Sequence, residues 1–349
     1  MNHCRLKLFI VGMLFCGLHS IQLKAQDAVF SQFFNNTLYL NPAQAGIEED
    51  FTISFGHRSQ WQSLQFPYTT SQFSAIMPFY KSKHTKPLGH IGAFGLSVYK
   101  DVAGENNNFK TTGVNGTAAY NLPLDRKYVN LITFGLQLGL INKRIDPDGL
   151  QWGEQYDPYV GFNSSITASE ASNLQGRTFI DINAGAFWWY TPIQIGSKLI
   201  NSANSGFSVS HLNNPNESLL EQDHQQLPLL YKYHGGIVFN VAKKATISAN
   251  LLTAFQDDSY QNNIGTYLSY KVTSYSQGNI KYAIARLGGW YRVQDSFIIL
   301  TEVETALFKV AFSYDWNTSS LRYNDRGIGT YEINLSYRFA NKAPAKSRY

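Results

Sequence analysis

The chain has 349 residues, of which 44% are hydrophobic, and its formal net charge is only +5 at pH 7. So small an excess of basic residues argues against a nucleic-acid partner. The only cysteines, Cys4 and Cys16, lie near the N-terminus, which argues against a disulfide framework and a cysteine-ligated metal.

Residues 1–25 have the pattern of a secretory signal peptide. Arg5 and Lys7 precede an uncharged run that ends at Leu18, and the small residue Ala25 stands at a suitable cleavage position. The run is too short to cross a bilayer as a helix, and bulky residues before Cys16 argue against a lipoprotein. Removing this segment takes away three of the 29 basic residues and leaves 26, against 24 acidic residues.

Residues 26–50, at the start of the exported chain, do not alternate as a strand does. Asn41 stands before Pro42 and is therefore biased towards extended backbone, whereas Gly46 permits a close approach or a left-handed turn. We expect this segment to fold either into the lumen of a barrel, as a plug, or onto its rim.

From residue 51 onwards, polar and apolar residues alternate repeatedly. In residues 132–140 the apolar side chains Ile132, Phe134 and Leu136 are separated by Thr133 and Gly135, and residues 331–339 repeat the pattern. Small or polar residues on the second face favour a water-filled or polar lumen, with the apolar face towards lipid. About fourteen strands are predicted, centred near residues 55, 73, 95, 116, 136, 184, 208, 236, 250, 267, 286, 299, 310 and 335. The fold class is therefore all-β: a transmembrane antiparallel β-barrel of about 14 strands in one domain, residues 26–349.

Aromatic residues gather near the predicted strand ends. They form the groups Trp188, Trp189 and Tyr190; Trp290 and Tyr291; and Tyr314 and Trp316. We interpret them as girdles at the membrane interfaces.

Arg58 lies on the predicted lumenal face of the first strand. There it could pair with an acid such as Asp315 or Glu332, and Trp61 would cover the contact. Such a cluster could hold residues 26–50 in place or contact a partner directly, and the sequence leaves both open.

Two long connections, Arg144 to Arg177 and Asn213 to Pro228, are candidate surfaces for protein partners, because long barrel loops are often functional. The residues proposed for contact are Asp146, Trp152, Tyr156, Asp157, Tyr159, Asn214 and Asn216. Residues 340–349 are basic and are expected to form a mobile tail.

Catalysis finds little support. His211 follows Ser210, but neighbours on a strand point to opposite faces, and Asp223 and His224 are merely adjacent in a loop. No nucleophile-elbow motif and no zinc-protease motif occurs. We expect neither catalytic residues nor a cofactor, and we expect His211 and His234 to be hydrogen-bonded wall residues.

Several segments resemble the PorP/SprF family of Bacteroidota outer-membrane proteins. They are FSQFFNNTLYLNPAQAGI at residues 30–47, HRSQW at 57–61, PYTTSQFSAIMP at 67–78, YKDVAG at 99–104, FSVSHLN at 207–213, FSYDWNTSSL at 312–321 and GTYEINLSYRF at 329–339.

This resemblance implies a non-enzymatic component of the type IX secretion system, held in outer-membrane lipid. The partners it implies are the periplasmic ring lipoprotein and its companion, a peptidoglycan-linked protein, or secreted cargo with a C-terminal signal such as a gliding adhesin. A core translocon subunit and a substrate-specific anchor both remain open. A porin or hydrophobic-compound transporter is the alternative, because it would share every feature except the family motifs.

Overall fold

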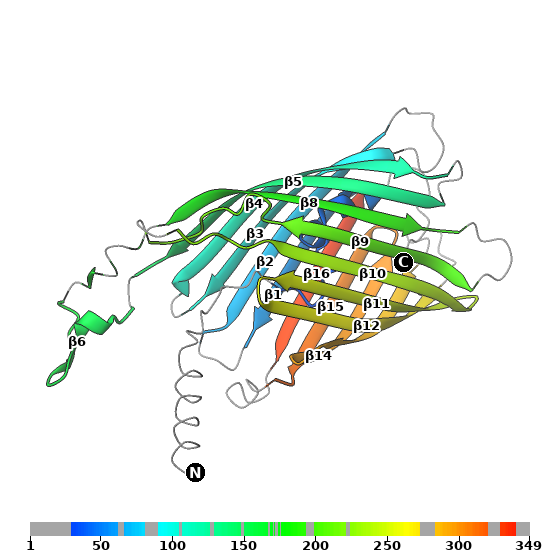
Figure 1. The fold of residues 1–349 in the computed structure, drawn as a ribbon. Coiled ribbons are helices and arrows are strands. Elements are labelled where there is room, and N and C mark those ends of the chain that lie inside the picture. The colour runs from blue at the N-terminus through cyan, green and yellow to red at the C-terminus, as the bar shows by residue number, and fades with distance from the viewer. Residues whose placement is uncertain are drawn as a thin grey trace, which may run out of the picture.

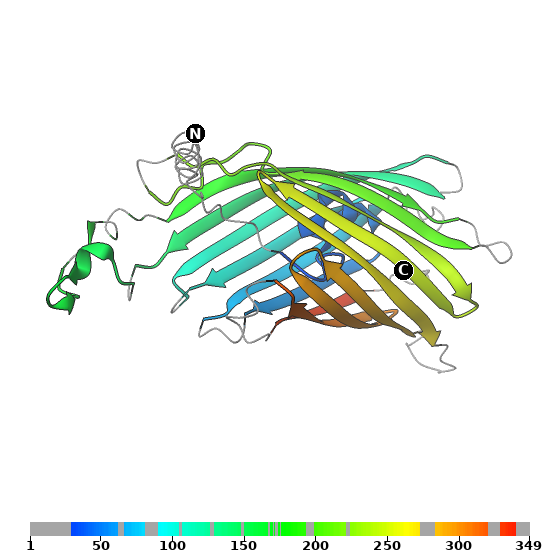
Figure 2. The ribbon, with the colours of Figure 1, turned by 60° about the horizontal axis from the view of Figure 1, so that its bottom comes forward.

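Fourteen antiparallel strands close into one barrel in the computed structural model (Figures 1 and 2). The structure describes residues 29–61, 66–80, 90–104, 107–125, 129–147, 150–166, 168–169, 171, 174, 176–192, 199–220, 224–272, 283–319 and 329–339. The predicted signal peptide and the predicted mobile tail lie outside these residues. The strand count and the barrel class predicted from the sequence are confirmed.

Each predicted strand centre falls inside a strand of the wall. The wall strands are β1 (Phe51–Gln60), β2 (Tyr68–Tyr80), β3 (His90–Ala103), β4 (Phe109–Pro123), β5 (Asn130–Ile145), β8 (Arg177–Tyr190), β9 (Ile200–Ser210), β10 (Leu230–Ala242), β11 (Ala245–Gln256), β12 (Ser259–Val272), β13 (Ala283–Arg292), β14 (Ser296–Thr305), β15 (Phe308–Asn317) and β16 (Thr330–Phe339).

Every wall strand pairs with its neighbours in chain order, and β1 closes the barrel against β16. We call the end where β1 finishes and β16 begins the loop end, and the opposite end the terminal end. The long connections 146–176 and 211–229 lie at the loop end, whereas two-residue turns join β10 to β11 and β14 to β15 at the terminal end. No helix among the described residues is long and apolar enough to cross a membrane.

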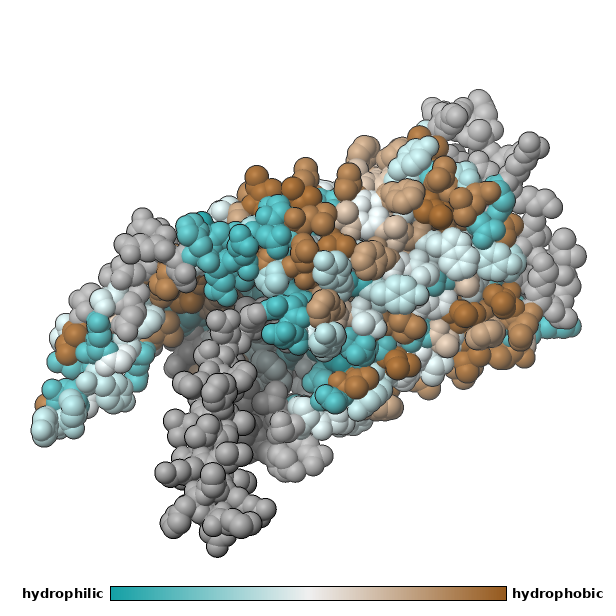
Figure 3. Space-filling view, in the orientation of Figure 1, coloured by the Kyte–Doolittle hydropathy of each residue, from teal (hydrophilic) through white to brown (hydrophobic). Residues whose placement is uncertain are grey.

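The outer face of the wall is apolar, as the alternation predicts. Leu136 and Leu138 are more than 60% exposed, whereas Thr133 and Gln137 on the same strand are buried inside. Figure 3 shows apolar residues spread over this face of the wall. Apolar side chains that are exposed on the outer face of a barrel are suited to contact with lipid.

The girdle prediction is wrong for two tryptophans. Trp189 and Trp290 are 6% and 2% exposed, and both point into the barrel. Trp316 is 48% exposed, as a lipid-facing residue would be. Parity explains the difference: adjacent residues on a strand face opposite sides, so Trp188 and Trp189 cannot both face lipid.

The plug segment, which we define as residues 29–50, lies in the lumen. It contains the short helix α2 (Thr37–Leu40) and the 3₁₀ helix η1 (Pro42–Ile47), and it appears in dark blue inside the barrel in Figures 1 and 2. The helix η1 packs against β3, β4, β5 and β8.

A small lobe projects from the loop end between β5 and β8 (Figure 1). We define the lobe as residues 150–166; it contains the 3₁₀ helix η3 (Gly153–Gln155) and a hairpin of β6 (Tyr156–Asp157) and β7 (Gly161–Phe162). Its two strands are separate from the barrel sheet.

Candidate functional site

A buried cluster of four charged residues binds the start of the plug near the loop end. Arg58 Nη1 lies 3.2 Å from Asp315 Oδ2 and 3.4 Å from Glu332 Oε2, and Arg292 Nη2 lies 3.4 Å from Asp315 Oδ2. All four side chains are at most 8% exposed. Two cations and two anions balance, which keeps the cost of burying them within what close pairing can offset.

Ser31 of the plug lies at the centre of this cluster. Its hydroxyl is in hydrogen-bonding contact with Asp315 and with Arg58, and Arg292 Nη2 donates to it at 2.8 Å. Its backbone N–H donates to Glu332 Oε2 at 2.7 Å. The cluster therefore contacts the plug directly.

Glu332 binds three further donors from the plug and the wall. Asn36 Nδ2 donates at 3.2 Å and Asn334 Nδ2 at 2.9 Å, while the backbone N–H of Gln32 shares both carboxylate oxygens at 3.3 Å. A carboxylate that accepts this many hydrogen bonds is well compensated for the loss of water.

A second ion cluster lies nearer the terminal end. Arg286 pairs with Glu302 and, at 2.6 Å, with Glu304, and Arg338 Nη1 lies 2.6 Å from Glu304 Oε1. Asn35 of the plug donates to Glu302 at 3.3 Å. The wall formed by β13 to β16 and β1 thus presents charged groups to the plug at two depths.

Asn41 joins the two helices of the plug to the opposite wall. Its Oδ1 accepts the backbone N–H of Ala43 at 2.9 Å, which caps η1, and its Nδ2 donates to the carbonyl of Ala186 at 3.0 Å. The ring of His234 lies 3.2 Å from the same Nδ2. Pro42 follows at the first position of η1, where a missing N–H costs nothing.

Gly46 and two wall glycines allow close contact between plug and wall. The Gly46 carbonyl accepts from Asn121 Nδ2 at 2.7 Å and contacts His90 Nε2 at 2.8 Å. A Cβ placed on Gly135 or Gly185 would lie less than 3.0 Å from atoms of the plug. Only glycine fits at these wall positions without displacing the plug.

Trp61 does not cover the Arg58 cluster, in contrast to the expectation from the sequence. Its side chain is 38% exposed, and its ring lies 6.4 Å from that of Tyr68 between centroids. Ser31 and Gln32 of the plug occupy the place that the sequence assigned to Trp61.

The lobe displays exposed apolar side chains around a tight turn. Asp157 Oδ1 accepts the backbone N–H groups of Tyr159 and Val160, and this turn leaves those two side chains 96% and 82% exposed. Tyr156 and Phe162 pack against each other across the hairpin. Trp152 is half-buried at its base.

Hydrogen bonds of Glu154 and Asp146 fix the rest of this connection. Glu154 accepts the hydroxyl of Ser169 at 2.5 Å and its N–H at 2.7 Å, and these hydrogen bonds lower the pKa of Glu154. Asp146 bonds through its backbone to Asn108 in the β3–β4 turn. The lobe is thus attached to a structured base.

The second predicted contact loop folds back on the barrel. Asn214 Nδ2 donates to the Leu227 carbonyl at 3.2 Å, and Asn216 Nδ2 contacts His224 Nδ1 at 2.9 Å. Glu217 is buried and pairs with Lys143. These side chains stabilise the loop itself, so fewer of them remain for a partner than the sequence suggested.

Buried aromatic residues of the lumen were missed by the sequence analysis. Phe33 of the plug packs edge-on against Trp290 at 5.1 Å, and Phe34 packs edge-on against Tyr267 at 5.2 Å. One signal was present: in residues 297–300, FIIL, both strand faces are apolar, which indicates that something apolar fills the lumen there.

The described residues contain no group of three or more His, Cys, Asp or Glu side chains placed to hold a metal ion. His211 Nδ1 lies 2.8 Å from Asp181 Oδ1, and both are buried in the wall. This geometry, like that of His234 with Asn41, fits a hydrogen-bonded wall residue.

Comparisons with solved structures give outer-membrane barrels. The toluene transporter TodX of Pseudomonas putida aligns at 10% identity and a TM-score of 0.45, covering 86% of this chain and 92% of its own. A FadL homologue of Pseudomonas aeruginosa aligns at 11% identity and a TM-score of 0.43, covering 86% and 93%. No curated protein sequence matches the chain.

The model of the family described as "Type IX secretion system membrane protein PorP/SprF" matches residues 22–337. That span includes the plug, the lobe and nearly all of the barrel wall. The chain therefore belongs to the PorP/SprF family of type IX secretion membrane proteins, and it is an outer-membrane β-barrel.

Proposed function

We propose that the barrel acts by binding, with the lobe at its loop end as the docking surface for a secreted protein. The observation that carries this proposal is the exposure of Tyr159 and Val160, at 96% and 82%, on a hairpin outside the barrel wall. Apolar side chains on the wall are accounted for by lipid, but those on the projecting lobe are not. Tyrosine is also enriched where proteins bind one another.

The orientation of the barrel favours a partner on the cell surface. Bacterial barrels have short periplasmic turns and longer external loops. Because the two longest connections, 146–176 and 211–229, lie at the loop end, we infer that the loop end faces outwards and the terminal end faces the periplasm. The partner class proposed for the lobe is therefore secreted cargo with a C-terminal signal, including a surface adhesin.

The other partners implied by the family would meet the terminal end. They are the periplasmic ring lipoprotein with its companion and the peptidoglycan-linked protein. The turn Lys243–Lys244 is exposed there. No exposed aromatic hairpin comparable to the lobe occurs at this end among the described residues, so cargo is the favoured class.

The test is affinity recovery from outer membranes solubilised in mild detergent, with mass spectrometry of the bound proteins. The double variant Tyr159→Ser with Val160→Ser should reduce recovery of cargo by roughly tenfold or more, as the loss of a central apolar contact does. Deletion of residues 148–172 should have the same effect while the barrel remains in the outer membrane.

The matched control is Tyr260→Ser. Tyr260 is 70% exposed and lies at the same end, but it belongs to the β11–β12 hairpin of the wall. Unchanged cargo recovery by the lobe variants would remove the lobe from the interface. Recovery of the periplasmic ring alone, from all variants equally, would instead identify a core subunit that docks through its terminal end.

A further inference from the structure

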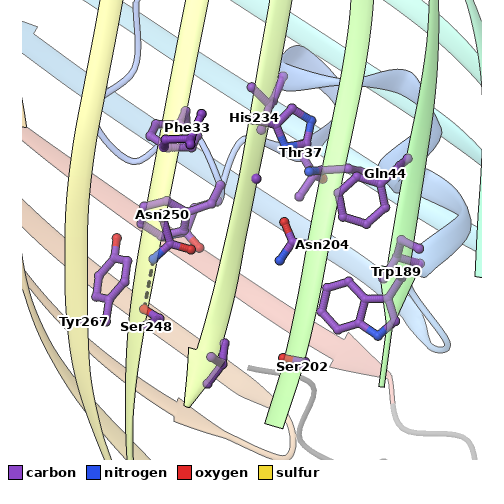
Figure 4. A pocket seen from close by; sticks show the side chains of 18 of the residues that line it. Phe33, Thr37, Gln44, Trp189, Ser202, Asn204, His234, Ser248, Asn250 and Tyr267 are labelled. Carbon is purple, nitrogen blue, oxygen red and sulfur yellow. Dashed lines mark hydrogen bonds between the residues drawn. The ribbon is translucent and has the colours of Figure 1, made fainter. Parts of the chain in front are cut away.

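Two cavities border the plug, one towards the loop end of the barrel and one towards the terminal end. The loop-end cavity, of about 520 Å³, is bordered by Tyr39, Trp61 and Gln256. The terminal-end cavity, of about 110 Å³, is bordered by Trp189, Ser202 and Lys309, and Figure 4 shows it from close by.

Two plug residues, Phe33 and Leu40, border both cavities. They belong to one apolar cluster with Leu252, Tyr267, Trp290, Ile298 and Leu300 of the wall. We call this cluster the septum. Its wall residue Leu252 borders the loop-end cavity, and Tyr267 and Trp290 border the terminal-end cavity. An apolar constriction excludes water and ions even when it is not completely closed, because water leaves a narrow apolar passage.

The opposite side of the plug is packed differently. Leu38 and Ala45 lie against Ile76, Ala93 and Ala119, all at most 3% exposed. A Cβ on Gly135 of that wall would overlap the backbone at Ala43. Neither cavity is bordered by Leu38 or Ala45, whereas every strand from β10 to β14 contributes residues to the border of both cavities.

The lining combines aromatic rings with uncharged polar groups. In the terminal-end cavity Trp189 and Tyr267 face Asn204, Ser248 and Asn250 (Figure 4). Ser202 is 1% exposed, and its hydroxyl has no hydrogen-bond partner among the described residues. It is therefore a buried polar group that a solute or water in the cavity can satisfy.

Three basic side chains that border the loop-end cavity are already bound to other groups. Arg58 and Arg292 bond to Asp315, and Lys232 Nζ donates to the Tyr39 carbonyl at 2.8 Å and lies over its ring. A lining that combines aromatic faces with amide and hydroxyl groups, and in which these basic groups are already bound, suits small uncharged solutes that have both an apolar part and hydroxyls.

We propose that the β10–β14 side of the lumen is a passage for such solutes, closed by Phe33 and Leu40 of the plug. The septum is the gate, and displacing its two plug side chains joins the cavities into one path. This passage does not depend on docking at the lobe, because none of its lining residues lies in the lobe.

The test is osmotic swelling of proteoliposomes in phenyl glucoside, an uncharged solute with an aromatic ring and hydroxyls. The wild-type barrel should swell slowly, and Phe33→Ala should raise the rate by roughly tenfold or more, because it removes the apolar constriction. The matched control is Leu38→Ala, which truncates an equally buried plug side chain on the packed side. Its rate should stay at the wild-type level.

A second measurement separates a specific path from a loosened barrel. Outside residues 1–25 the sequence has no cysteine, so Ser202→Cys places a single thiol in the terminal-end cavity. A bulky methanethiosulfonate should block the swelling of the Phe33→Ala, Ser202→Cys barrel. The proposal fails if folded Phe33→Ala barrels swell no faster than wild type, if Leu38→Ala swells equally fast, or if the thiol reagent leaves the rate unchanged.

Discussion

Arg58 on β1 and Asp315 on β15 meet at 3.2 Å inside the barrel, across β16, the strand that lies between theirs. Because β1 and β16 are the first and last strands, this pair spans the seam where the barrel closes. The same pair also binds Ser31 of the plug. The cluster therefore ties closure of the barrel to seating of the plug.

Arg58→Ala should destabilise the barrel by about 3–5 kcal/mol, because it leaves the buried Glu332 carboxylate without a cation within salt-bridge distance in the described part of the chain. The plug should become accessible to protease at the same time. Heat-dependent migration on gels measures the first effect, and limited proteolysis of residues 29–50 measures the second. The exposed Arg144 supplies the control variant Arg144→Ala. Equal protease resistance of the plug in both variants would contradict an anchoring role for Arg58.

Gly135→Ala should destabilise the barrel by about 1–3 kcal/mol, because the added methyl group overlaps the plug backbone at Ala43. Gly116→Ala is the control: it lies on the neighbouring strand β4, where a Cβ would meet nothing within 4 Å. Urea unfolding followed by tryptophan fluorescence compares the two. A loss of the same size for both variants would show that strand propensity, rather than contact with the plug, sets the effect.

Trp316 and Trp290 should respond differently to lipids with brominated acyl chains. Trp316 is 48% exposed on the outer wall, whereas Trp290 is 2% exposed in the septum. In barrels that retain one of these tryptophans, bromolipid should quench the fluorescence of Trp316 and leave that of Trp290 nearly unchanged, because contact quenching needs access to lipid. Quenching of Trp290 to the same extent would place it on the lipid face.

The wall was predictable from the sequence because the alternation within each strand shows which residues face lipid and which face the lumen. Alternation such as that of residues 132–140 depends only on which side meets lipid, so all fourteen strands could be found one at a time. Parity alone would also have assigned Trp189 to the lumen, since Trp188 and Trp189 are adjacent.

The interior was less predictable, because its contacts join residues far apart in the chain. The sequence placed Arg58 on the lumenal face with Asp315 and Glu332 as possible partners, but Ser31, which joins them, lies in a segment without periodicity. The septum likewise depends on Phe33 meeting Trp290 more than 250 residues later. Such pairs follow from the path of the plug, which no local pattern specifies.

Asn41 combines two tasks that substitutions can separate. Its Oδ1 caps η1 through Ala43 N, while its Nδ2 donates to the carbonyls of Ala186 and Phe207 on β8 and β9. Asn41→Ala loses both, so it should cost about 2 kcal/mol or more from the lost cap and the unsatisfied carbonyls. Asn41→Asp keeps an acceptor for the cap but turns a carboxylate oxygen towards those carbonyls, so it should be the less stable of the two.

Urea unfolding of both variants tests this order against Asn201→Ala, whose amide meets only the side chain of Asn240 among the contacts resolved for it. The Asn201 variant should lose less stability than either. If Asn41→Asp is as stable as wild type, capping alone explains Asn41. The donor bonds from Asn41 to the wall would then contribute nothing measurable to stability.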